Sequence, residues 1–201
     1  MSVSSGDRPE PRPRPGNLRE FGEKIENMTG LRVQIVGGRL VMSPTPRGKH
    51  AGVVKRLRRQ LEESGLPPGL DVYEVSSIAL PEDLDDYATP DLVVLPTDWE
   101  EDDDWLADSR DAVLAVEVIS QSEKSREIRD KADWYAVALV PALLVVDPRK
   151  SVWALHTRPG NGSYQQVLPG KFGESVRLPG PLDVEVDTGD FPVYGSPPER
   201  G

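Results

Sequence analysis

Two acidic residues lie where a buried carboxylate would need a partner. Asp91 follows Pro90 and leads into the apolar run at residues 92–95, and Glu117 lies near the end of a second apolar run at residues 112–119. Continuous apolar runs of this length are typical of strands that are buried on both faces. A charge in such a strand costs several kcal/mol unless it is paired, hydrogen-bonded or bound to a metal.

A shared divalent cation would explain why both acids are tolerated. Two carboxylates on neighbouring strands repel each other unless a cation lies between them. Because the chain has no cysteine and only two histidines, His50 and His156, the hard cations Mg²⁺ and Mn²⁺ fit best. The alternative is that each acid accepts hydrogen bonds from an arginine or a backbone amide, which is commoner for an isolated acid at a strand end. Spacing alone leaves both explanations open.

The elements that must position these acids can be predicted from hydrophobic periodicity and turn residues. Residues 31–42 form a hairpin around Gly37-Gly38, and residues 72–80 form a strand that is interrupted by two serines. Between them lies a helix with one apolar stripe, formed by His50, Val53, Val54, Leu57 and Leu61. A second helix is expected at 123–138, followed by a hairpin of strands 142–146 and 151–156, and then by short peripheral strands.

This order of elements predicts an α/β (α+β) domain with a mixed sheet. We expect one domain at residues 18–194, between a disordered N-terminal tail at 1–17 and a disordered C-terminal tail at 195–201, because both ends are rich in Pro, Gly, Ser and Arg. The chain has no apolar run of about 18 residues, and its first residues are rich in Pro and Arg where a signal peptide would be apolar. We therefore predict a cytoplasmic protein.

The charges are segregated along the chain. The formal net charge of -10 argues against a protein that coats nucleic acid indiscriminately, but it leaves room for a local basic surface. Basic residues cluster early in the sequence, at Arg47, Lys49, Lys55, Arg56, Arg58 and Arg59. Acidic residues crowd positions 100–111. The alternative explanation for both clusters is ordinary solvated surface.

Several short motifs occur in a defined order. They are GRLVMSP at 38–44, His50, PDLVV at 90–94, EVIS at 117–120, Lys131, Tyr135 and VVDP at 145–148. In this order and spacing the chain resembles the Uma-two family of endonucleases, which belongs to the PD-(D/E)XK superfamily. The resemblance covers about residues 31–194 and includes the closing segment LPGPLDVEVDTGDFP.

The resemblance implies a restriction-endonuclease-like core, in which a mixed β-sheet is flanked by helices and carries additional β-hairpins. It also implies that Asp91 and Glu117 bind Mg²⁺ or Mn²⁺, with the main-chain carbonyl of Ile119 as a further ligand. Such an ion lowers the pKa of its bound water and stabilises charge that builds on phosphate oxygens. The expected reaction is hydrolysis of a phosphodiester bond in DNA.

The third catalytic residue implied by the resemblance is a lysine. In the superfamily it usually lies two residues after the glutamate, where this chain has Ile119, but in the resembling family the following helix supplies it, at Lys131. One face of that helix is formed, at spacings of four, three and four residues, by Lys124, Ile128, Lys131 and Tyr135. Lys131 could therefore point back toward Glu117. The alternative is an exposed Glu127–Lys131 pair worth about 0.2–0.5 kcal/mol.

One departure from the family pattern concerns the first hairpin strand. The family commonly has an acid there, whereas this chain has Gln34. An amide oxygen can bind a hard cation but adds no charge, so metal affinity would be lower or one metal site would be lost. His50 is a further accessory candidate near the phosphate, and the alternative is a hydrogen-bonded core histidine.

Two functional hypotheses follow. The first is a metal-dependent DNA endonuclease, whose contacts with the DNA backbone are made by Lys49, Lys55, Arg56, Arg58 and Arg59. The second is a catalytically weak or inactive module that keeps the nuclease fold and binds nucleic acid or forms a dimer, which Gln34 and the acidic net charge favour. The sequence leaves the oligomeric state open, although symmetric homodimers are the commonest oligomers.

Overall fold

The computed structural model describes residues 17–43 and 45–195. The N-terminal tail predicted at 1–17 lies outside the described residues except for its last residue, and the C-terminal tail predicted at 195–201 lies outside them except for its first. The boundaries of the predicted domain therefore stay predictions.

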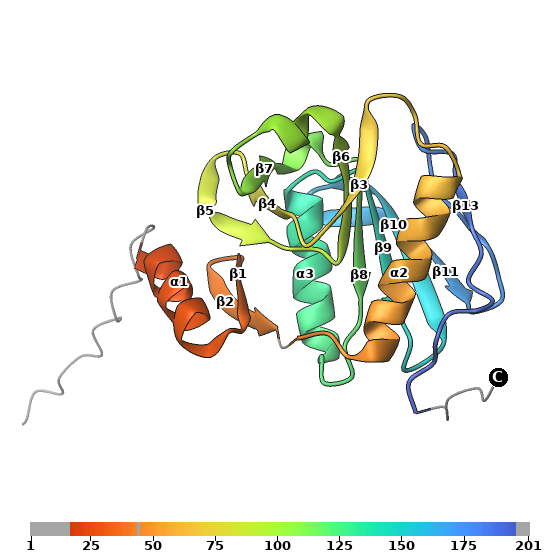
Figure 1. Cartoon of the computed structure of the whole chain (residues 1–201), viewed down its shortest axis with the longest axis horizontal. Coiled ribbons are helices and arrows are strands. Elements are labelled where there is room, and N and C mark those ends of the chain that lie inside the picture. The colour runs from red at the N-terminus through yellow and green to blue at the C-terminus, as the bar shows by residue number, and fades with distance from the viewer. Residues whose placement is uncertain (1–16, 44, 196–201) are drawn as a thin grey trace, which may run out of the picture.

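The central sheet has six strands in the order β11-β10-β9-β8-β6-β3 (Figure 1). Their bounds are Leu70–Glu74 for β3, Leu92–Pro96 for β6, Leu114–Val118 for β8, Ala142–Asp147 for β9, Val152–Gly160 for β10 and Ser163–Lys171 for β11. Strands β8 and β9 run parallel, and the other neighbours in this sheet are antiparallel. The sheet is therefore mixed, as the sequence predicts.

A second mixed sheet has the order β2-β1-β5-β4-β7, and a two-stranded sheet pairs β12 with β13. The strand bounds are Arg32–Val36 for β1, Arg39–Ser43 for β2, Ser77–Leu80 for β4, Asp83–Ala88 for β5, Leu106–Asp108 for β7, Val176–Arg177 for β12 and Glu185–Val186 for β13. Two short 3-10 helices, Thr97–Glu101 and Ser109–Asp111, flank β7.

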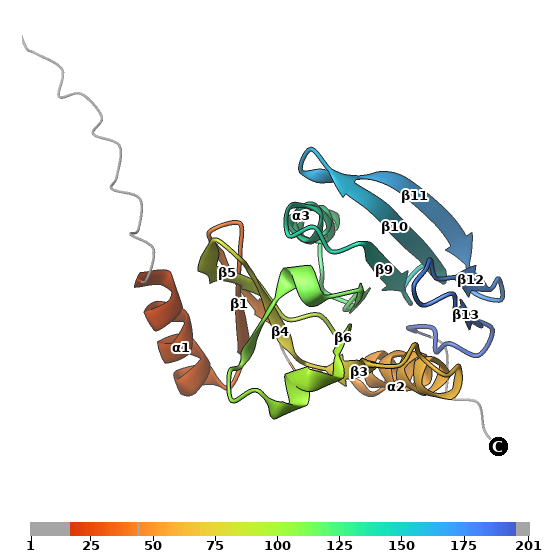
Figure 2. The same ribbon diagram turned by 90° about the horizontal axis from the view of Figure 1, so that it is seen from above.

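Helices cover both faces of the central sheet (Figure 2). Helix α2, Gly48–Glu63, packs on one face, and helix α3, Ser125–Val137, packs on the other. Helix α1, Asn17–Thr29, packs against β1 of the second sheet. No helix within residues 17–43 and 45–195 is long and apolar enough to cross a membrane.

Most of the predicted elements occur in the structure. The apolar stripe predicted for the first helix corresponds to the buried residues of α2, and the predicted Gly-Gly hairpin is the β1–β2 pair. The interrupted strand at 72–80 divides into β3 and β4, which belong to different sheets, and Val75 between them adopts a positive φ of 59°. The prediction of only short strands after residue 156 is wrong, because β11 has nine residues and pairs along its length with β10.

A buried carboxylate joins the second sheet to α3. Asp86 on β5 is 8% exposed and accepts hydrogen bonds from the backbone amides of Gly37 at 3.0 Å and Gly38 at 2.9 Å. It also accepts one from Trp134 Nε1 on α3 at 2.7 Å. Both glycines have positive φ, which the tight turn between β1 and β2 requires. Asp86 therefore holds the hairpin and α3 in a fixed relation.

We expect Asp86→Ala to lower the free energy of unfolding by about 2 kcal/mol or more, because the buried indole N–H of Trp134 and the two partly buried amides of the hairpin turn would lose their acceptor. Urea denaturation followed by tryptophan fluorescence measures this change. The control is Asp85→Ala, at the adjacent half-buried acid of β5, which we expect to cost about 0.5 kcal/mol or less. Equal losses in the two variants would contradict the structural role of Asp86.

Candidate active site

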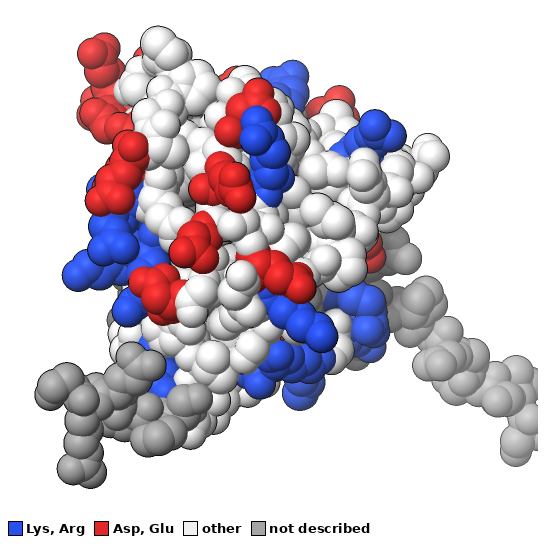
Figure 3. Space-filling model, turned by 90° about the vertical axis from the view of Figure 1, so that its right-hand side faces the viewer, with Lys and Arg blue, Asp and Glu red and all other residues white. Residues whose placement is uncertain are grey.

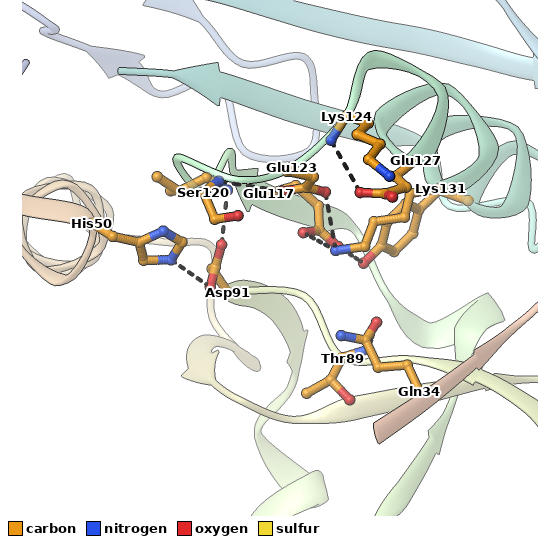
Figure 4. A network of polar contacts seen from close by, with 12 residues as sticks. Gln34, His50, Thr89, Asp91, Glu117, Ser120, Glu123, Lys124, Glu127 and Lys131 are labelled. Carbon is orange, nitrogen blue, oxygen red and sulfur yellow. Dashed lines mark hydrogen bonds and ion pairs between the residues drawn. The ribbon is translucent and has the colours of Figure 1, made fainter. Parts of the chain in front are cut away.

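The pairing of β6 with β8 brings Asp91 and Glu117 to one place. The strands are antiparallel with Leu92 opposite Val116, so the residue before β6 lies beside the end of β8. The backbone amide of Asp91 donates to the Val116 carbonyl at 3.0 Å, and Asp91 Oδ2 accepts from the Val118 amide at 2.8 Å. Both acids line a pocket of about 760 Å³ (Figure 4). They therefore face the same space, as the metal hypothesis requires.

Glu117 is held by two side chains from α3. It is 5% exposed, and its Oε2 accepts a hydrogen bond from Lys131 Nζ at 2.8 Å. Its Oε1 accepts one from the Tyr135 hydroxyl at 2.7 Å. Lys131 is turned inward to Glu117, while the carboxylate of Glu127 accepts the backbone amide of Lys124 at 3.0 Å. The exposed Glu127–Lys131 pair left open by the sequence is therefore not what the structure shows.

Burial and charge act against each other at these groups. Burial raises the pKa of Glu117 above its ordinary value, Lys131 opposes that shift, and the nearby charge of Asp91 adds to it. Burial alone would lower the pKa of Lys131, but the attraction of Glu117 and Glu123 outweighs it and raises that pKa. Lys131 therefore stays an ammonium group. Its positive charge does not fully offset the effect of burial and of Asp91 on Glu117, whose pKa stays raised.

Asp91 is held from the opposite side by α2. Its Oδ1 lies 2.9 Å from Nε2 of His50, which is 7% exposed, and Nδ1 of the same ring lies 3.4 Å from the hydroxyl of Tyr194. The backbone amide of Tyr194 donates to the Pro148 carbonyl at 3.0 Å, which fixes this C-terminal segment beside the pocket. His50 is thus a hydrogen-bonded histidine that also contacts a predicted catalytic acid.

Gln34 lies on the same pocket wall. It is 1% exposed, and its Oε1 accepts a hydrogen bond from the backbone amide of Thr89 at 3.1 Å. Gln34, where the resemblance predicts an acid, is therefore a buried neutral group that lines the same pocket as Asp91 and Glu117, with its carbonyl oxygen already hydrogen-bonded. It adds no charge to the site.

Sequence reasoning missed two groups of the site. Glu123 lines the pocket, with Oε1 3.8 Å from Lys131 Nζ and Oε2 accepting from the Ser120 amide at 3.2 Å. Tyr194 also lines the pocket, and the sequence predicts only that it ends the domain. The sequence predicts only that a helix begins at Glu123, because no spacing rule connects this residue with Lys131 until the loop between β8 and α3 has folded.

Two other predicted site residues lie away from the pocket wall. Lys124 is exposed at the start of α3, and the Ile119 side chain is buried among the apolar residues on the α3 side of the sheet. Neither is among the described residues that line the pocket. The Ile119 carbonyl as a metal ligand stays a prediction.

The five basic residues predicted to contact DNA all lie on α2, but only Lys49 is among the described residues that line the pocket, and Lys55 is exposed. Lys49 lines the pocket, and its Nζ donates to the Val193 carbonyl at 2.7 Å. Arg56, Arg58 and Arg59 on α2 form ion pairs with acids, namely Asp190 for Arg56, Glu62 and Glu74 for Arg58, and Glu63 for Arg59. Figure 3, which views the side that carries α2 and β13, shows acidic and basic side chains interspersed. The charges of these arginines are therefore partly balanced.

The chemistry of the site fits Mg²⁺ or Mn²⁺ bound with help from a substrate. Within the described residues, no three His, Cys, Asp or Glu side chains form a group that could hold a metal by themselves. Mg²⁺, however, is commonly bound by one or two carboxylates, with water and substrate phosphates completing its shell. Asp91 and Glu117 offer such a pair, although each of their four oxygens now accepts a hydrogen bond or contacts a histidine.

Comparisons with known proteins bear on the family and the fold of this chain. Residues 18–189 match the model of the Uma2 family, which is described as a putative restriction endonuclease. A structure with a similar fold is that of a putative nuclease belonging to DUF820 from Anabaena variabilis, at a TM-score of 0.59 and 14% identity. The match covers 75% of this chain and 83% of that one, and it supports the predicted mixed α/β fold. No curated protein matches this chain.

The buried ion pair yields a prediction about stability without metal. We expect Glu117→Gln and Lys131→Met each to lower the free energy of unfolding by about 3 kcal/mol or more, because each leaves a buried charge without its main partner. The double variant should lose less than the sum of the two. Urea denaturation in the presence of a chelator measures all three, and additive losses would show that the two groups are not coupled.

Proposed function

This chain belongs to the Uma2 family, and from that premise we propose that it is a metal-dependent endonuclease that hydrolyses phosphodiester bonds in DNA. The observation that carries the proposal is the meeting of two carboxylates from neighbouring strands with a buried ammonium group in one pocket. Asp91, Glu117 and Lys131 all line that pocket, which is large enough to admit a phosphodiester group. Perturbed titratable groups gathered in a cleft are a common sign of a catalytic site.

We assign separate roles to these side chains. Asp91 and Glu117 would hold Mg²⁺ or Mn²⁺, with the Ile119 carbonyl as a further ligand, and the bound ion would supply an activated water and offset phosphate charge. Lys131 would orient the attacking water and offset negative charge on the phosphate oxygens. Tyr135 fixes the orientation of Glu117 through its hydrogen bond, and His50 does the same for Asp91.

DNA would approach the pocket across a local basic rim. Arg32, Arg47 and Lys49 line the pocket, so they are placed to neutralise phosphates on either side of the bond that is cut. Lys55, Arg56, Arg58 and Arg59 on α2 would extend this surface, with the contribution of the last three reduced by their acidic partners. A symmetric homodimer that cuts both strands, and a cytoplasmic location, stay predictions.

The proposal is tested by incubating purified protein with plasmid DNA and Mn²⁺ or Mg²⁺. We expect cleavage that a chelator stops, no cleavage by Asp91→Asn or Glu117→Gln, and a rate lowered by about a hundredfold or more in Lys131→Met. Asp133→Asn, at an exposed acid on α3, is the matched control and should cut like the unmodified protein. Cleavage that is unchanged in the variants of Asp91 and Glu117 would sink the proposal.

Specific observations favour a second candidate, a catalytically weak or inactive module that binds nucleic acid and keeps the fold. Gln34 brings no charge to the pocket, and the carboxylate oxygens of Asp91 and Glu117 are already engaged by protein groups. A cation must therefore compete with Lys131 for Glu117. On this hypothesis no cation would displace Lys131 from Glu117, and the ion pair between them would persist.

Calorimetric titration with Mn²⁺ distinguishes the two candidates. For an active nuclease we expect binding in the millimolar range or tighter, and we expect Gln34→Glu to bind Mn²⁺ about tenfold more tightly because it adds a third carboxylate. Without metal the same substitution should destabilise the protein, since like charges would be buried together. Salt-sensitive DNA binding with no Mn²⁺ binding by the unmodified protein would select the inactive module.

A further inference from the structure

The pairing of Lys131 with Glu117 creates a difficulty for a metal site. The ammonium group is buried, with its side chain 11% exposed, and its close partner is Glu117 at 2.8 Å. If a divalent cation binds Glu117, the negative charge of that carboxylate is no longer available to Lys131 alone. A buried ammonium group that loses its counter-ion costs several kcal/mol, and this cost would weaken cation binding.

A second carboxylate lies close to the same ammonium group. Glu123 Oε1 is 3.8 Å from Lys131 Nζ, and the Glu123 side chain is 13% exposed. Its Oε2 accepts a hydrogen bond from the Ser120 amide at 3.2 Å, which fixes the carboxylate in the loop between β8 and α3. Figure 4 shows Glu123 and Glu117 on the same side of the Lys131 ammonium group.

The loop that carries Glu123 is anchored from the β9–β10 turn. Arg149 donates to the main-chain carbonyl of Glu123, and its guanidinium binds both oxygens of Asp147 at 2.8 Å. Two parallel charge-assisted bonds of this kind fix the guanidinium plane firmly. Glu123 is therefore held near Lys131 by contacts that do not involve Glu117.

We propose that Glu123 is a positioning residue that serves as the second counter-ion of Lys131 and takes over its ion pair when a divalent cation engages Glu117. This inference rests on the proposed function and explains how the site accepts a cation without leaving an ammonium group unpaired. Lys131 then stays charged and close to the phosphate. Neighbouring acids are less suited: Asp91 is engaged by His50 and the Val118 amide, and Glu127 is exposed.

A cycle of unfolding measurements tests this role without any metal. Glu117→Gln removes the charge of the first counter-ion, as a bound cation would neutralise it, so Lys131 must then rely on Glu123. Glu123→Gln keeps an oxygen that can accept the Ser120 amide. We expect it to raise the unfolding equilibrium constant at least about tenfold more in the Glu117→Gln background than in the unmodified protein.

The matched control for this cycle is Glu127→Gln. Glu127 also accepts a backbone amide at the start of α3, from Lys124, but it is exposed. Its substitution should change the unfolding constant by the same small factor in both backgrounds. If Glu123→Gln also acts equally in both backgrounds, Glu123 is not a reserve counter-ion and the inference is overturned.

Mn²⁺ binding, measured by calorimetry on the full chain, gives a second test that does not depend on the stability of Glu117→Gln. We expect Glu123→Gln to raise the Kd for Mn²⁺ at least about tenfold, and Glu127→Gln to leave it within about twofold. In the Lys131→Met background, where no ammonium group needs a partner, Glu123→Gln should leave the Kd for Mn²⁺ within about twofold of that of Lys131→Met alone. If Glu123 merely bound the cation itself, its substitution would raise that Kd about as much in the Lys131→Met background as in the unmodified protein.

The outcomes separate this inference from the proposed function. If the unmodified protein binds Mn²⁺ and cuts DNA but Glu123→Gln has the same Mn²⁺ affinity, the inference fails and the nuclease proposal stands. If the unmodified protein binds no Mn²⁺ at millimolar concentration, the nuclease proposal fails and there is no cation for Glu123 to accommodate. Mn²⁺ binding that Glu123→Gln weakens about tenfold in the unmodified protein, but not in the Lys131→Met background, supports both.

Discussion

The buried ion pair between Glu117 and Lys131 is the constraint on which the rest of the site depends. Neither charge is tolerated in a sheet covered on both faces unless the other is present, so α3 must lie with Lys131 over the end of β8. The antiparallel pairing of β6 with β8 then places Asp91 beside Glu117. Asp86 holds α3 to the hairpin that carries Gln34. The position of each pocket wall therefore follows from a small number of buried polar contacts.

Local patterns were enough to predict most of the framework. Apolar runs identified β6, β8 and β9, and the apolar stripe of α2 matched its buried face residue by residue. Asp91 and Glu117 could be singled out because an acid beside a buried strand needs a partner, and their positions at opposite strand ends suggested that they would meet. These features depend on neighbours in sequence or on adjacent strands. The identity of Lys131 as the third group came from the family resemblance.

Contacts between distant segments could not be predicted in this way. The turn of the chain at Val75 separates β3 from β4, and no residue pattern showed that the two strands belong to different sheets. The contact of Tyr194 with His50 joins residues 144 positions apart. Whether Lys131 pairs with Glu127 on the surface or with Glu117 inside depends on how α3 packs on the sheet, since helical spacing permits both. Helical periodicity predicts which residues share one face of a helix, but the packing of the helix determines which residues that face contacts.

On the proposed function, the contacts that the two carboxylates already make would set how strongly the site binds a cation. Asp91 and Glu117 would attract a divalent ion strongly if they were exposed and unpaired, but Lys131, Tyr135 and His50 already stabilise them. Cation binding must replace part of that stabilisation, so the net affinity is the difference between two favourable arrangements. The same contacts hold both carboxylates in place before any cation arrives, which lowers the entropy lost on binding. The contacts that hold the carboxylates in place would thus lower the affinity for a cation while they preorganise its ligands. Substrate phosphates, which add ligands and negative charge, would raise that affinity.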